Sequence, residues 1–121
     1  MTPAQHRAKA QRIERTMARL QPADVELRIE GAMLAGTHWL NAALHEAGAT
    51  ADAADVMHSY MLVVNELRRL RLYCGGAIDA LSEIEDLRPG WVRGDLPDGE
   101  AVAARTDVLL ARLRAAASTG G

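Results

Sequence analysis

Residues 68–86 read RRLRLYCGGAIDALSEIED and place two adjacent glycines, Gly75 and Gly76, in the middle of a helical pattern. Apolar or small residues recur every three or four positions on both sides of the pair, which is the spacing of one buried helix face. These positions are Tyr60, Val63, Leu67, Leu70, Cys74, Ala77, Leu81 and Ile84. The pattern predicts one long helix from about Ala53 to Arg88, ended by the Pro-Gly pair that follows.

The presence of two glycines requires an explanation, because each glycine inside a helix lowers the stability of the helix by roughly 1 kcal/mol relative to alanine. One interpretation is a helix break, in which the helix stops at Tyr73 and Gly75 forms its cap. The other is the close approach of a second helix to bare main chain. We favour the second interpretation, because the apolar stripe keeps its phase across the glycines.

The sequence on either side of this segment predicts three more helices. TPAQ at residues 2–5 has the pattern of a capping box with proline at the first helical position, so it begins the first helix. A second helix is expected over about 22–47, where Gly48 supplies the stop. A proline- and glycine-rich connection then precedes a last helix over about 99–117.

These elements define the expected fold class, which is all-α. The arrangement predicted is a four-helix bundle with a long third helix, and the protein is expected to be dimeric. Residues 1–117 are expected to form a single helical domain, because the chain is of the size that one core can serve. Residues 118–121 are small or polar and predict a disordered C-terminal tail.

Composition excludes several classes of partner. The formal net charge is -2, so the chain lacks the basic excess that drives sequence-independent phosphate binding, and nucleic acid is not expected as a partner. No apolar run approaches the roughly 18 residues of a membrane span, and the polar N-terminus lacks the features of a signal peptide. The single cysteine fits a reducing compartment. We therefore expect a cytoplasmic protein without a membrane contact.

Histidines supply the one candidate ligand pocket. His38 and His45 lie seven positions apart and share a face of the second helix, with Glu30 and Asn41 nearby, so these four residues form the candidate pocket. The two histidines are about 10.5 Å apart along the axis, which is wide for two ligands of one metal. His58, the nearest third ligand, is expected on a face that points away. The sequence therefore predicts no metal, no cofactor and no catalytic residue.

Two further features have ordinary structural interpretations. Cys74 falls on the apolar stripe and is expected to be a buried thiol. Five arginines could form a basic patch, but a solvated helix face with internal ion pairs such as Glu66 with Arg69 is the favoured interpretation. The five are Arg68, Arg69, Arg71, Arg88 and Arg93.

The order of charges around the glycines predicts self-association. Basic residues precede the pair and acidic residues follow it, so a second copy of the helix packed antiparallel would set each basic half against an acidic half. The expected pairs are Arg71 with Glu83 and Arg68 with Asp86. The predicted homodimer interface comprises Arg68, Arg71, Leu72, Gly75, Gly76, Ile78, Asp79, Glu83 and Asp86.

Two stretches resemble the HEPN superfamily of small bacterial helical bundles. They are RIEGAMLAGTHWLNAALHEAG at residues 28–48 and VMHSYMLVVNELRRLRLY at residues 56–73. The resemblance implies the helical fold and the habit of forming dimers. Catalytic members carry an arginine followed four to six residues later by a histidine, and no pair in this chain has that spacing.

The function expected from the sequence is therefore non-catalytic. We predict a dimeric helical-bundle protein that acts through protein–protein interaction, as an accessory, antitoxin-like or regulatory subunit with a second protein partner. The alternative is a HEPN-like enzyme acting on nucleotide or RNA, or a ligand-binding bundle, that uses His38 and His45.

Overall fold

The computed structural model describes residues 1–118, and its elements follow one another as helices joined by short connections. The α-helices are α1 (Pro3–Met17), α2 (Val25–Glu46), α3 (Val64–Arg88) and α4 (Gly99–Ser118). Two short turns adjoin α3, a 3-10 turn η1 (Ser59–Met61) and a π turn η2 (Pro89–Arg93). The prediction of an all-α fold is confirmed for the described residues, which include no strand.

The C-terminal boundary lies close to its predicted position. Helix α4 continues to Ser118, so the first residue of the expected tail is helical. The other three residues of that tail, 119–121, lie outside the described part of the chain.

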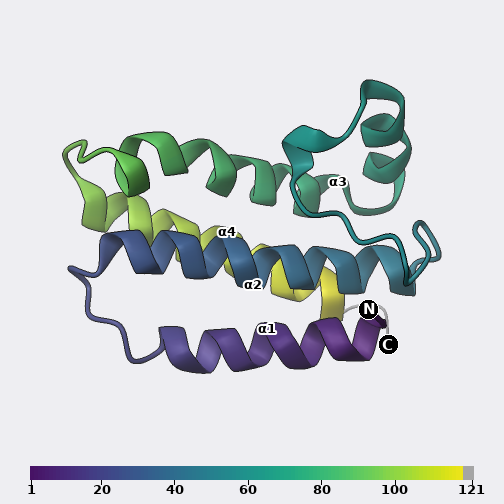
Figure 1. Ribbon diagram of the computed structural model, residues 1–121, viewed down its shortest axis with the longest axis horizontal. Helices are drawn as coiled ribbons and strands as arrows, with labels where there is room; N and C mark the ends of the chain where they lie inside the picture. Colours follow the sequence, from purple (N-terminus) through teal and green to yellow (C-terminus); the bar gives the residue numbers. More distant parts are fainter. Residues whose placement is uncertain (119–121) are drawn as a thin grey trace.

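Helix α1 begins as its sequence predicts. The Thr2 hydroxyl accepts a hydrogen bond from the Gln5 amide at 3.1 Å, and the Gln5 side chain accepts one from the Thr2 amide at 2.9 Å. This reciprocal pair satisfies two amides that the first helical turn would otherwise leave unpaired. The chain then turns after Met17 and returns as α2, so that α1 and α2 lie side by side and antiparallel (Figure 1).

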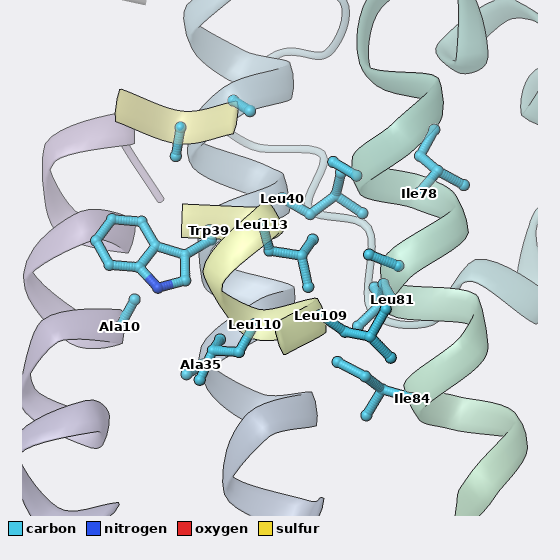
Figure 2. Packing of buried hydrophobic residues seen from close by; sticks show 14 of the residues in the cluster. Ala10, Ala35, Trp39, Leu40, Ile78, Leu81, Ile84, Leu109, Leu110 and Leu113 are labelled. Carbon is cyan, nitrogen blue, oxygen red and sulfur yellow. The ribbon is translucent and has the colours of Figure 1, made fainter. Parts of the chain in front are cut away.

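Helix α2 is the centre of the structure, because it packs against α1, α3 and α4. Trp39 points toward Ala10 of α1, whereas Leu40 faces Leu113 of α4 and the leucine and isoleucine side chains of α3 (Figure 2). Five of the eleven buried residues of α2 are alanine or glycine. Such small side chains allow neighbouring helices to approach closely, which fits a chain with very few aromatic residues.

Helix α3 is shorter and less regular than the sequence predicts. It begins at Val64 rather than near Ala53, and at Cys74 the backbone has φ -139° and ψ 46°, which is not helical. Figure 1 shows the segment before Cys74 turned away from the segment after it. The prediction of a continuous rod through the glycines is therefore wrong, and the alternative of a break is the one that the structure contains.

The predicted apolar stripe is buried only in part. Leu70 before the bend and Ala77 after it are buried, but Tyr60 and Val63 lie before α3 and are 67% and 70% exposed. Neither glycine adopts a positive φ, so the break is not a left-handed glycine cap. Two adjacent residues of weak helix propensity allow the bend.

Surface charges form ion pairs within the chain. The predicted pair of Glu66 and Arg69 is present at 2.7 Å, and Arg71 pairs with Asp79 across the bend. These contacts favour the interpretation of the arginines as a solvated face. None of the described helices combines the length and apolarity that crossing a bilayer requires.

The contact between α2 and α4 gives the first testable prediction. A methyl group added at Gly36 would lie 2.8 Å from Cδ1 of Leu113, which is fully buried. Gly36→Ala should therefore lower the free energy of unfolding by about 1–3 kcal/mol, despite the better helix propensity of alanine. Urea denaturation of the variant measures the change.

The double variant is the control for that prediction. Leu113→Ala alone removes buried methyl groups and should cost about 2–5 kcal/mol. In its presence, Gly36→Ala should cost little or become favourable, because the new methyl group occupies vacated space. Equal costs of Gly36→Ala in both backgrounds would contradict the close contact.

Candidate metal centre

Four polar side chains meet where the start of α1 lies beside the end of α2. His6 comes from α1, and His38 and His45 come from α2. Asp55 comes from the connection that leaves α2 and precedes η1. Three separate segments of the chain thus supply one cluster, which we call the histidine cluster, defined by His6, His38, His45 and Asp55.

The connection after α2 is held in place by backbone and side-chain hydrogen bonds. Gly48, the predicted stop, has a φ of +74°, which reverses the chain direction. The Ala49 amide then donates to the Leu44 carbonyl at 2.9 Å. The Asn41 side chain accepts from the Val56 amide and donates to the Val56 carbonyl, both at 2.7 Å. Since Asp55 precedes Val56, these bonds fix its position against α2.

The distances within the cluster are those of hydrogen bonds. Nε2 of His6 lies 2.8 Å from Oδ1 of Asp55, and Nε2 of His45 lies 2.7 Å from the same oxygen. Nδ1 of His6 lies 2.9 Å from Nδ1 of His38. Nδ1 of His45 lies 2.6 Å from the Thr50 hydroxyl. Each nitrogen of His6 and of His45 therefore has a partner.

Without a metal, these contacts specify the tautomer that each neutral ring would adopt. The Asp55 carboxylate only accepts hydrogen bonds, so His6 and His45 both donate to it from Nε2–H. When both rings are neutral, Nδ1 of each accepts a hydrogen bond, from His38 in one case and from Thr50 in the other. One carboxylate and three neutral imidazoles then satisfy one another.

The same groups also fit a divalent cation. The ligand atoms of His6, His45 and Asp55 all lie within 4.8 Å of one another. In a tetrahedral zinc site with bonds of about 2.0–2.2 Å, ligand atoms lie about 3.3 Å apart. Oδ1 of Asp55 lies closer than this to both imidazole nitrogens, at 2.8 Å and 2.7 Å, so ion binding requires the carboxylate and the two rings to adjust their positions.

The hydrogen bonds made by Nδ1 of His6 and by Nδ1 of His45 are also compatible with metal binding. A histidine that binds a metal through one nitrogen usually donates a hydrogen bond from the other, which fixes the ring and its tautomer. If Nε2 of His6 and of His45 bound the ion, Nδ1–H of each would donate to His38 and to the Thr50 hydroxyl. His38 would therefore be a positioning residue and not a ligand.

Burial leaves one side of the cluster open. His6 is 1% exposed and His45 is 7% exposed, whereas the Asp55 side chain is 28% exposed. The N-terminal ammonium of Met1 lies 3.7 Å from Oδ1 of Asp55. Three protein ligands is the number that catalytic zinc sites use, whereas structural zinc sites use four.

Two pKa shifts describe the electrostatics of the cluster. Burial lowers the pKa of His38, and the neighbouring His6 and Lys9 add to the effect because they oppose a second positive charge. Burial alone would raise the pKa of Asp55, but the hydrogen bonds from His45 and His6 outweigh it and the pKa lies below its usual value. Both shifts favour the neutral His38 and the charged carboxylate on which metal binding depends.

The predicted pocket of four residues is only half assembled. His38 and His45 lie in the histidine cluster. The other two residues have different partners, since the Glu30 carboxylate forms an ion pair with Arg88 and the Asn41 side chain forms hydrogen bonds with the backbone of Val56. His58 does not lie on a helix, because the chain is still irregular at that point, and its Nδ1 lies 3.4 Å from the buried carboxylate of Glu85.

His6 and Asp55 were missed by the sequence analysis. A signal for His6 exists, since it lies 16 positions before Pro22 and His38 lies 16 positions after it. In an antiparallel helix pair that turns at this proline, the two residues stand opposite each other. Asp55 gives no such signal, because its position depends on the contacts of an irregular connection.

The residues of the predicted dimer interface occupy different environments. Ile78 is only 1% exposed within a single chain, so it has no apolar surface left to bury against a second copy. Arg71 pairs with Asp79, and Glu83 pairs with Arg105, within the same chain. Arg68, Leu72 and Asp86 are exposed, and Gly75 and Gly76 line a groove together with Asp79 and Glu83.

Comparison of the chain with protein-family models, with curated proteins and with solved structures found no match.

The hydrogen bonds of Asn41 give a second prediction. Asn41→Ala leaves the amide and carbonyl of Val56 without their partner in a buried position, which should lower the free energy of unfolding by about 2–4 kcal/mol. Chemical denaturation measures the loss. Asn65→Ala, at an exposed asparagine of α3, is the matched control and should change stability by less than about 0.5 kcal/mol. Similar small effects of both substitutions would contradict the anchoring role of Asn41.

Proposed function

We propose that this protein binds one divalent transition-metal ion through His6, His45 and Asp55 and uses it for Lewis-acid chemistry. The observation that carries this proposal is the convergence of the three ligand atoms from three separate segments, with an outer partner on each histidine. Imidazole and carboxylate ligands suit zinc, iron and related ions. Two histidines and one carboxylate with open positions form a recurrent catalytic ligand set.

The chemistry proposed is metal-assisted hydrolysis of a small substrate. An ion such as Zn²⁺ lowers the pKa of a bound water to about 7 and polarises a carbonyl or phosphoryl oxygen. His6 and His45 would hold the ion from the buried side, and Asp55 would hold it from the side that faces solvent. His38 would orient His6 through the contact between their Nδ1 atoms.

Titration with Zn²⁺ tests the metal proposal. Calorimetry on protein purified without a histidine tag and treated with chelator should show one ion bound per chain. His45→Ala, His6→Ala and Asp55→Asn should each weaken binding at least about tenfold, because each removes a ligand atom. His58→Ala is the matched control, since His58 lies outside the cluster, and should bind as the parent does.

Two outcomes would contradict this proposal. One is the absence of saturable Zn²⁺ binding by the folded parent protein, which would make the cluster a purely structural hydrogen-bond network. The other is loss of binding in His58→Ala with retention in His45→Ala. Hydrolysis assays on ester, phosphodiester and RNA substrates, with and without chelator, then identify the reaction and include the RNA-acting alternative suggested by the HEPN resemblance.

The second candidate function is a dimeric, non-catalytic interaction protein of the cytoplasm, an accessory, antitoxin-like or regulatory subunit in a helical-bundle fold. The observation that favours it is a run of exposed apolar side chains before α3 and at its bend, at Tyr60, Met61, Val63 and Leu72 among others. Such surfaces in a small protein are typical of interaction sites. Light scattering at micromolar concentration should give a dimer, and a single species of 13.1 kDa would contradict this candidate.

A further inference from the structure

Exposed apolar side chains concentrate at one end of the molecule. Of the twelve large apolar side chains exposed in residues 1–118, five lie between Met57 and Val64, and two more are Leu72 and Tyr73. The first part of α3, which carries several of them, projects beyond the other helices (Figure 1). Leu72 is the extreme case, with 85% of its surface exposed. Leaving this much apolar surface in water is unfavourable for an isolated chain.

A groove lies directly beside this projecting segment. It has a volume of about 700 Å³ and runs between the bend of α3 and the last turns of α4. Its apolar lining includes Ala77, Ala80 and Leu109, and Tyr73 belongs to its wall. Small side chains make the groove suitable for the close approach of another helix or of a protruding side chain.

The glycines have no packing role within one chain. A methyl group added at Gly76 would meet no atom within 4 Å, and one added at Gly75 would make only an ordinary contact with Arg71. Neither glycine needs its special backbone freedom, because neither has a positive φ. Both line the groove, so besides allowing the bend they leave this part of the groove free of side chains.

We propose that the groove at the α3 bend binds the Leu72 segment of a second copy of this chain. A protruding apolar side chain and a groove for it lie next to each other on the same surface. A two-fold axis near the bend places each copy's Leu72 in the other copy's groove, which is the self-complementary arrangement of a symmetric dimer. This inference specifies the partner of the second candidate function and rests on it, but it does not depend on metal binding.

Charges around the groove support a second copy as the occupant. Among the described residues, Arg68 lies one turn before Leu72 and has no ion-pair partner, and the same is true of Asp86 on the far side of the bend. The groove itself is lined by Asp79 and Glu83, which pair with Arg71 and Arg105 of the same chain, and by Arg112. In the two-fold arrangement, the basic segment of one copy approaches the acidic segment of the other, and each contact occurs twice.

The decisive experiment compares two exposed leucines. Leu72→Asp places a charge in the proposed groove and should weaken the dimer at least about tenfold, as measured by analytical ultracentrifugation of the full chain. Leu27→Asp is the matched control, because Leu27 is 61% exposed on a helix remote from the bend in sequence, and it should leave the dimer intact. Both positions are exposed in a single chain, so neither substitution should unfold it, and circular dichroism checks this.

A charge exchange tests the orientation of the two copies. Arg68→Glu should weaken the dimer several-fold, because it sets an acidic side chain against the acidic segment of the second copy. Adding Asp86→Arg to it should restore the affinity, since the symmetric dimer then regains both opposite pairs. Failure of this restoration would overturn the proposed antiparallel arrangement.

These experiments distinguish failure of the proposed groove contact from failure of the second candidate function on which it rests. A parent protein that remains monomeric would overturn both. A dimer that survives Leu72→Asp, or that dissociates in Leu27→Asp, would overturn the groove while leaving a dimeric interaction protein in place.

Discussion

The packing of α2 against three other helices is the contact on which the rest of the structure depends. A central helix can touch neighbours on several sides only if its side chains are small enough for them to approach, and α2 is rich in buried alanine, with Gly36 in contact range of Leu113. Larger buried residues of α2 include Trp39, which faces α1, and Leu40, which faces α4 and α3. The low aromatic content of the chain is thus a requirement of its architecture.

The histidine cluster is a consequence of that packing. Because α1 lies antiparallel to α2, the first turns of one helix stand beside the last turns of the other, and His6 comes within hydrogen-bond reach of His38. The connection after α2 then folds back over the same end, tied by Asn41, and brings Asp55 against two imidazoles. Buried polar groups are tolerated only when they are paired, and these are paired through the hydrogen bonds of the histidine cluster and Thr50.

The bend in α3 divides the helix into two segments that differ in how much apolar surface they expose. After Cys74 the helix packs on α2 and α4, whereas before it the chain projects and leaves apolar side chains in water. An ion pair between Arg71 and Asp79 spans the bend. Apolar periodicity predicts which side of a helix is buried, but it does not predict whether the helix axis is straight.

The sequence by itself determined the helical class, the capping box of α1, the stop at Gly48 and the pair of Glu66 with Arg69, because all of these depend on residues within a few positions of one another. It gave the limits of α2 and α4 to within a few residues. Only the tertiary structure decided the bend at Cys74, the late start of α3 and the meeting of His6, His45 and Asp55. These features depend on which distant segments become neighbours, and local periodicity carries no information about an irregular connection that is held by side chains from another helix.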